Sequence, residues 1–88
     1  MEIVFMNSYL KAIKKIKNSN LILNLQNTID NVEKADSTDK ILNLKKLAGF
    51  TNCYRIKVEN YRIGLIINNN VATLVQFQHR KDIYNKFP

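Results

Sequence analysis

The side chains best suited to chemistry in this chain of 88 residues are cations and aromatics in its last third. They are Arg55, Lys57, Arg62, His79, Arg80 and Tyr84. A guanidinium held on a rigid surface stabilises negative charge developing on a phosphate, whereas lysine, histidine and tyrosine can transfer protons. RNA carries its own nucleophile, the 2′-hydroxyl, so a protein need only align the strand, stabilise the phosphorane and move protons. These residue types therefore leave RNA cleavage without a metal open to the chain.

Each of these residues also has an ordinary structural explanation. Arg55 and Lys57 can be solvent-facing strand residues, and Arg62 can be a cross-strand ion-pair partner. His79 can end a strand without a further task, and Tyr84 can close the core with its hydroxyl at the surface. The combination of these residues, and no single one, favours a functional site.

Positive charge is confined to one half of the chain. The whole chain has 14 Lys and Arg against 7 Asp and Glu, a formal charge of +7. Residues 1–39 contain five of each sign, whereas residues 40–88 contain nine basic residues and only two acidic ones, Glu59 and Asp82. Such a patch raises the local concentration of phosphate and speeds encounter with nucleic acid. An acidic protein partner explains the same excess, so charge alone does not choose between them.

Several classes of site are disfavoured by the residues that the chain lacks. Cys53 is the only cysteine and His79 the only histidine, so neither a disulfide framework nor a metal site is expected, and no cofactor is implied. Gly49 and Gly64 are isolated and form no phosphate-binding loop. No stretch approaches the roughly 20 apolar residues that span a membrane, and no signal peptide is visible. We expect a cytoplasmic protein that has no membrane partner.

Hydrophobic spacing predicts a strand and two helices in the first half. Residues 3–5 indicate a short opening strand, and residues 18–20 break the helical pattern and can cap a second helix. The apolar stripes of the two helices are Tyr9, Leu10, Ile13 and Ile16, then Ile22, Leu25, Ile29 and Val32. Residues 34–40 are a polar loop, and residues 41–49 are an apolar tethering segment that ends at Gly49.

After Gly49 the period changes to two, which is typical of half-buried strands. The predicted strands are Cys53–Glu59, Tyr61–Asn68 and Val71–Gln78, joined by turns at residues 59–60 and 68–70. In the first of them, alternation sends Tyr54, Ile56 and Val58 into a core and leaves Arg55 and Lys57 on the other face.

The predicted fold is a single α+β domain of residues 1–88 with the order β-α-α-β-β-β. Two N-terminal helices form an antiparallel hairpin on one face of a small, mainly antiparallel sheet of about four strands. A C-terminal tail or short helix follows. The other face of the sheet is expected to be free for a ligand.

Four stretches of the chain occur in an order that matches a known family. They are Leu44–Phe50 (LKKLAGF), Tyr54–Val58 (YRIKV), Tyr61–Gly64 (YRIG) and His79–Tyr84 (HRKDIY). This order and spacing resemble the RelE/ParE superfamily of bacterial and archaeal toxins, whose members commonly read L-K-x-L-x-G, Y-R-I-R-V-x-x-Y-R-I and H-R-x-x-V-Y. The resemblance covers residues 41–87, and the start of the chain matches in pattern only.

The resemblance implies the toxin of a type II toxin–antitoxin pair, held inactive by a cognate antitoxin protein. A RelE-type member would cleave mRNA on the ribosome without a metal or cofactor and leave a cyclic or 3′ phosphate and a 5′-hydroxyl. DNA would be contacted only through the antitoxin complex.

The resemblance also implies roles for single residues. By motif position, Arg55 and Lys57 match the paired basic residues of the family's first meander strand, Arg62 its central arginine and Tyr84 its C-terminal tyrosine. The expected catalytic set is Arg55, Lys57, Arg62, His79, Arg80 and Tyr84, and the expected RNA-binding lysines are Lys45, Lys46 and Lys81.

Two alternatives stay open on the same fold. RelE itself has further basic residues where this chain has Gln76, Phe77 and Gln78. ParE-type members poison gyrase and do not cleave RNA, and a third possibility is a noncatalytic basic module that binds protein or nucleic acid through a degenerate site. The joint retention of Lys57, Arg62, His79 and Tyr84 favours an active site.

Overall fold

Five strands form one sheet in the computed structural model, which describes residues 1–88. The elements in chain order are β1 (Glu2–Phe5), α1 (Asn7–Ile13), α2 (Ser19–Lys34), the 3-10 turn η1 (Thr38–Lys40), β2 (Leu44–Lys46), β3 (Cys53–Val58), β4 (Tyr61–Asn68), β5 (Val71–His79) and α3 (Ile83–Lys86). The strand order is β1-β5-β4-β3-β2. β1 runs parallel to β5, and every other neighbouring pair is antiparallel. The predicted α+β class is confirmed.

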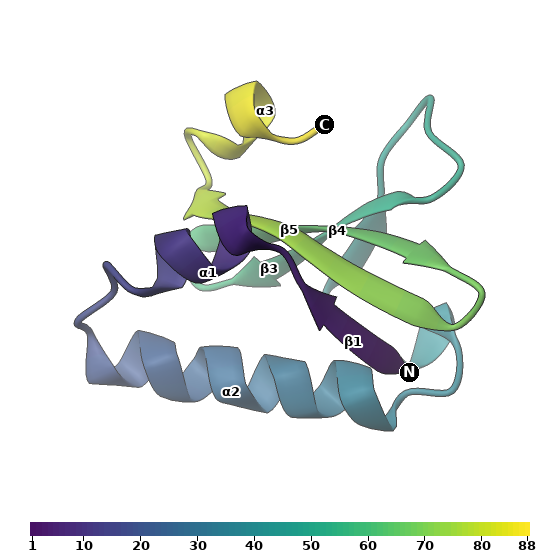
Figure 1. The fold of residues 1–88 in the computed structure, drawn as a ribbon, viewed down its shortest axis with the longest axis horizontal. Coiled ribbons are helices and arrows are strands. Elements are labelled where there is room, and N and C mark those ends of the chain that lie inside the picture. The colour runs from purple at the N-terminus through teal and green to yellow at the C-terminus, as the bar shows by residue number, and fades with distance from the viewer.

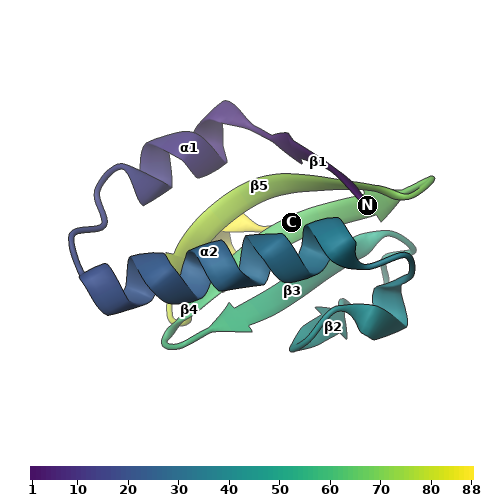
Figure 2. The same cartoon turned by 90° about the horizontal axis from the view of Figure 1, so that it is seen from below.

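The two N-terminal helices lie together on one face of the sheet. α2 runs along the sheet below β3 and β4, and α1 lies beside β5 and runs in the opposite direction (Figures 1 and 2). The Asn18 side chain accepts a hydrogen bond of 3.0 Å from the Leu21 backbone N–H, which caps α2 as residues 18–20 predicted. The face of α2 that is buried differs slightly from the predicted stripe, because Leu21 is buried and Ile22 is 38% exposed.

The main core lies between these helices and the sheet. Its buried members include Tyr9 of α1, Val32 of α2, Ile56 of β3 and Leu65 of β4. Tyr54, Ile56 and Val58 all face this core, as the alternation in β3 predicted. Because successive side chains of a strand point to opposite faces, the intervening cations must lie on the other side of the sheet.

The fifth strand, β2, was not predicted. Its three residues pair antiparallel with β3, with Leu44 opposite Ile56, Lys45 opposite Arg55 and Lys46 opposite Tyr54. Three residues are too few to show a two-residue period, so the sequence pattern identified this part only as a tethering segment. The predicted sheet of about four strands therefore gains one short edge strand.

Both predicted turns are present, and each contains at least one residue with positive φ. Glu59 adopts φ 55° in the turn between β3 and β4. Asn69 and Asn70 have φ 50° and 63° in the turn between β4 and β5, a conformation that asparagine tolerates better than most residues. The Glu59 carboxylate accepts a hydrogen bond from the Asn24 side chain of α2, which ties this turn to the helix.

A β-bulge interrupts β5 at Val75. Gly64 of β4 pairs with Gln76 and Leu65 pairs with Leu74, so Val75 has no partner in the ladder. The carbonyl of Val75 instead accepts a hydrogen bond of 2.5 Å from the Ser8 hydroxyl of α1. A bulge of one residue shifts the alternation of the strand by one position, so Leu74 and Phe77 both reach the main core.

The face of the sheet opposite the two helices is only partly free. A second small core of Leu47, Cys53, Ile83 and Phe87 lies there, with Ile66 and Val75 packed against it. α3 closes this core from above the sheet (Figure 1). The face that was predicted to be free for a ligand is therefore covered in part by the C-terminal turn and open elsewhere. No helix has both the length and the apolar character needed to cross a membrane.

We expect the Tyr9→Phe variant to lose part of the alkaline sensitivity of the wild type. Tyr9 is 1% exposed, and burial raises its pKa from 10.0 to about 12. The unfolded chain releases the proton near pH 10 while the folded chain retains it, so the stabilisation is full below pH 10 and disappears as the pH rises towards 12. A pKa difference of this size corresponds to roughly 2–3 kcal/mol. Urea unfolding at pH 8, 10 and 11.5 measures the effect.

The comparison at pH 8 serves as the control, because Tyr9 is neutral there in both the folded and the unfolded chain. An equal loss of unfolding free energy in wild type and variant between pH 10 and 11.5 would contradict the assignment.

Candidate functional site

Cations of three neighbouring strands lie on the α3 face of the sheet. Lys45 of β2 is directly opposite Arg55 of β3, and Lys57 of β3 is directly opposite Arg62 of β4. Like charges in directly opposite positions destabilise a sheet. This arrangement is therefore unfavourable for folding and is the arrangement that a polyanion would stabilise.

Two adjoining hollows open over these cations. One hollow, of about 420 Å³, is lined by Arg55, Arg62, Arg80, Lys81, Ile83 and Tyr84. The other, of about 410 Å³, is lined by Asn43, Leu44, Lys45, Arg55, Lys57, Arg62 and Tyr84. Arg55, Arg62 and Tyr84 line both hollows, and no carboxylate lines either. The wall between the two hollows therefore carries the guanidinium groups of Arg55 and Arg62 and the phenol of Tyr84.

Arg62 is held in place by backbone carbonyls. Its Nη1 donates hydrogen bonds to the carbonyl of Glu59 at 3.1 Å and to the carbonyl of Tyr61 at 2.8 Å. These bonds leave Nη2 and Nε of the guanidinium without a protein acceptor in this turn. The ion pair considered between Arg62 and an acid is replaced by these backbone contacts, which fix the guanidinium at the site.

Arg55 contacts the C-terminal segment through a hydrogen bond and a cation–π interaction. Its Nη2 donates to the carbonyl of Phe87 at 3.2 Å, and its Cζ lies 4.5 Å from the centre of the Tyr84 ring. The buried Nε of Arg55 has no hydrogen-bond partner. A guanidinium over a tyrosine ring is attracted by the ring's electrons. Arg55 thus connects the sheet to the segment that carries Tyr84.

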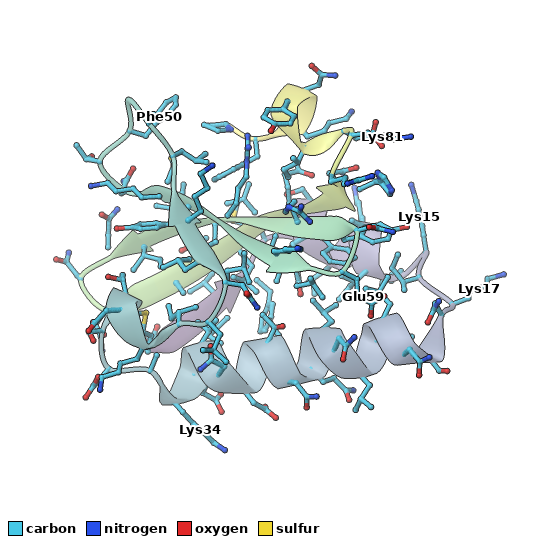
Figure 3. The ribbon with its side chains drawn as sticks, turned by 180° about the vertical axis from the view of Figure 1, so that it is seen from behind. Lys15, Lys17, Lys34, Phe50, Glu59 and Lys81 are labelled. Carbon is cyan, nitrogen blue, oxygen red and sulfur yellow. The ribbon has the colours of Figure 1, made fainter.

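Tyr84 is presented above the sheet by α3. Its side chain is 73% exposed, whereas the neighbouring Ile83 is 1% exposed and Phe87 is 4% exposed. The two buried residues anchor the turn and leave the phenol facing outward. Lys81, just before α3, projects from the same end of the molecule and lies far from Lys34 at the end of α2 (Figure 3).

The structure separates His79 from the cations that the sequence grouped with it. Counted by strict alternation from Leu74, His79 would lie on the cation face, but the bulge at Val75 reverses the phase. His79 instead pairs with Tyr61, packs edge-on against its ring at 5.5 Å, and accepts a hydrogen bond of 3.2 Å from the Lys81 N–H through Nδ1. It lines neither hollow.

Lys46 is also separated from the group, because it pairs with Tyr54 and lies on the side of the two helices. The structure thus brings together seven of the nine residues singled out from the sequence. They are Lys45, Arg55, Lys57, Arg62, Arg80, Lys81 and Tyr84.

Two residues near the site were not recognised from the sequence. Phe87 packs on Gly64, and a Cβ on Gly64 would lie 2.5 Å from Cγ of Phe87. A glycine inside a strand pattern is a known signal of a close approach by another part of the chain. The identity of the approaching residue follows only from the structure. No group of three or more His, Cys, Asp or Glu side chains is placed to hold a metal ion.

The fold and site define a small α+β domain that carries a basic sheet face beneath a tyrosine. No protein-family model matches the chain. The toxin RelE3 of Methanocaldococcus jannaschii is 32% identical over 89 residues, which cover all of both chains. The chain therefore belongs to the RelE family of toxins.

Solved structures agree with this assignment. A chain of the RelB–RelE antitoxin–toxin complex from Methanococcus jannaschii is 30% identical, covers 97% of this chain and 99% of its own length, and has a TM-score of 0.80. A chain of the archaeal RelE–RelB complex from Pyrococcus horikoshii is 17% identical over 90% of this chain and 93% of its own, with a TM-score of 0.73. The second similarity shows the fold alone.

We expect Lys45→Ala and Lys46→Ala to differ in their effect on polyanion binding, although the residues are adjacent. Lys45 lines a hollow and Lys46 lies on the opposite face. Loss of one phosphate contact should reduce the salt dependence of the affinity for a single-stranded oligodeoxynucleotide by about 0.7 in the slope of log K against log salt concentration. Fluorescence anisotropy titrations between 50 and 200 mM salt would measure the slope. At these salt concentrations, the charge of Lys46 on the opposite face is screened from an oligonucleotide bound at the α3 face.

Lys46→Ala should keep the wild-type slope. Equal slopes for the two variants would show that the α3 face is not the polyanion-binding surface.

Proposed function

We propose that this chain is the toxin of a type II toxin–antitoxin pair and that it cleaves mRNA on the ribosome without a metal. Membership of the RelE family supports the toxin assignment. The observation that carries the proposal of cleavage is the convergence of Arg55, Arg62 and Tyr84 on the wall shared by two hollows. A phosphate between the hollows would contact the guanidinium groups and the phenol, while the neighbouring nucleotides extend to either side.

Arg62 is the residue best placed to stabilise the transition state. Attack by the 2′-oxygen turns the phosphate into a phosphorane with additional negative charge on its equatorial oxygens. A donor that is already fixed in position stabilises this charge without reorganisation during the reaction. The two hydrogen bonds from Arg62 to backbone carbonyls supply that fixation. Lys57 and Arg80 add charge on the two sides of it.

Proton transfer falls to Lys57 and Tyr84 in this proposal. The 2′-hydroxyl gives its proton to a base as the bond between O2′ and phosphorus forms. The bond between phosphorus and O5′ breaks, and the departing O5′ takes a proton, so that the products are a 2′,3′-cyclic phosphate and a 5′-hydroxyl. Arginine is a poor base because it keeps its proton at any physiological pH. His79 lies on the other face of the sheet and takes no part in proton transfer in this proposal.

We expect induction of the wild-type chain to arrest growth and to produce 5′-hydroxyl cuts in translated messages. Arg62→Ala should lower the rate of cutting on programmed ribosomes by a factor on the order of 10²–10³, the usual effect of losing one preorganised donor. Mapping of 5′-hydroxyl ends after induction, together with purified ribosomes and one defined message, would measure both effects.

Lys46→Ala is the matched control and should cut at the wild-type rate. The thermal unfolding temperature of Arg62→Ala should stay near that of the wild type. Arg62 is the second residue of β4, and its guanidinium bonds only to carbonyls at the adjoining turn. Double-strand breaks in DNA with intact messages would instead assign the chain to the gyrase-directed toxins. Full cutting by Arg62→Ala would overturn the proposed active site.

We propose further that the cognate antitoxin occupies the apolar groove between α1 and α2. The groove has a volume of about 320 Å³ and is lined mainly by apolar side chains, including Phe5, Ile13, Ile16 and Ile22. Phe5 is 43% exposed and Ile22 is 38% exposed, which is unfavourable for apolar groups that stay in water. An amphipathic helix laid in such a groove buries its apolar face. The relatives from Methanococcus jannaschii and Pyrococcus horikoshii are solved as antitoxin complexes.

We expect Ile22→Asp to weaken antitoxin binding at least tenfold, because a carboxylate in the groove would lose its water when the partner binds. Leu23→Asp is the matched control, since Leu23 is the next residue of α2, is 54% exposed and does not line the groove. Co-purification with the product of the neighbouring gene, followed by calorimetry, would measure both affinities. Equal affinities for the two variants would place the antitoxin elsewhere on the molecule.

A further inference from the structure

The segment that carries Tyr84 has little stability of its own. α3 contains four residues, and one turn of helix is unstable in water unless other parts of the protein hold it. Tyr84 is 73% exposed and therefore does not anchor the turn. The buried residues on either side of it, Ile83 and Phe87, must determine where its ring lies.

Phe87 sits on the one place in β4 that has no side chain. A Cβ added to Gly64 would lie 2.5 Å from Cγ and 2.6 Å from Cδ2 of the Phe87 ring, and 3.0 Å from its Cβ. These atoms are close to the backbone of Phe87, so a rotation of the ring alone cannot relieve the overlap. Gly64 does not have a positive φ, so its backbone conformation is one that alanine also adopts. The glycine is therefore needed for space.

This contact lies next to the residue that links the sheet to Tyr84. Gly64 is directly opposite Arg55 in the ladder between β3 and β4. Arg55 donates a hydrogen bond to the carbonyl of Phe87 and lies beneath the ring of Tyr84. How closely Phe87 packs on Gly64 therefore sets the position of the Phe87 carbonyl. That carbonyl orients the Arg55 guanidinium, which in turn sets the position of the Tyr84 ring above Arg55.

We propose that Gly64 and Phe87 are positioning residues, which hold Tyr84 and Arg55 in the geometry that the reaction requires. The contact acts through the backbone of residues 84–87 and does not itself touch RNA. The consequence for cleavage rests on the proposed function, whereas the effect on the geometry of Tyr84 does not. A residue that only filled the small core would affect stability and binding together. A positioning residue lowers turnover and leaves RNA affinity unchanged.

Three single variants and one double variant test this proposal. Gly64→Ala and Phe87→Ala should each lower the turnover of bound message at least tenfold. The affinity for a single-stranded oligodeoxynucleotide should stay within about twofold of wild type, because the cations that bind phosphate remain on the sheet. Phe87→Leu keeps an apolar anchor and should retain most of the turnover. In the Phe87→Ala background, the addition of Gly64→Ala should have no further effect, because the ring that it would strike is absent.

A second measurement reports the geometry without RNA. In the wild-type protein, nuclear Overhauser effects should connect the Arg55 side chain with the Tyr84 ring, whose centre lies 4.5 Å from Cζ of Arg55. They should disappear in Gly64→Ala and persist in Phe87→Leu, while the chemical shifts of the main core stay unchanged. If the wild type cleaves no RNA, the proposed function is wrong. The nuclear Overhauser effects alone then show whether Gly64 and Phe87 position Arg55 and Tyr84.

Three results would overturn the proposal. The first is a Gly64→Ala variant that keeps both the wild-type turnover and the contact between Arg55 and Tyr84. The second is a loss of oligonucleotide affinity as large as the loss of turnover. The third is global unfolding of both Gly64→Ala and Phe87→Ala, which would make the contact a general support of the fold.

Discussion

The alternation of side chains along β3 and β4 is the constraint on which the rest of the molecule depends. Each apolar residue that enters the core beneath the two helices places its neighbour on the opposite face, so Ile56 and Val58 determine the direction of Arg55 and Lys57. Burial of Ile63 directs Arg62 in the same way. The core holds cations in positions where they repel one another, because a strand cannot turn single side chains away without losing its register. The stability of one face thus supports an unfavourable arrangement on the other.

The second small core completes the site that the main core begins. A bare sheet would present its cations to solvent on a flat surface, where water screens them. α3 adds a wall above the sheet at Ile83 and Tyr84, so that the cations line hollows. Charges at the base of a partly enclosed space act through a lower effective dielectric constant than charges on an open surface. The chain shares its fold with a solved RelE protein. In this chain, that fold places the basic face and the overlying tyrosine together.

Sequence patterns predicted the parts of the fold that repeat, and missed the parts that depend on a single contact. Alternation in β3 and the apolar stripes of the helices were sufficient for the α+β class and for the face of Arg55 and Lys57. β2 was missed because three residues contain no period. His79 was grouped with the cations because nothing in the sequence marks the extra residue at Val75, which changes its face. The contact between Gly64 and Phe87 joins positions 23 residues apart in the chain, and no local pattern reports such a pair.

The bulge at Val75 ties the length of β5 to contacts on both faces of the sheet. A loop can gain or lose a residue at little cost, and most strands can do so at their ends. In β5, removal of Val75 would restore a regular ladder and leave Leu74 and Phe77 facing the core. The small core would lose the Val75 side chain, and the Ser8 hydroxyl of α1 would lose the carbonyl that accepts its hydrogen bond. The HRKDIY stretch would keep its phase, because the later residues would still pair with the same residues of β4. Among descendants of this chain, insertions and deletions should accumulate in the connections, while the count of residues from Val71 to His79 stays the same.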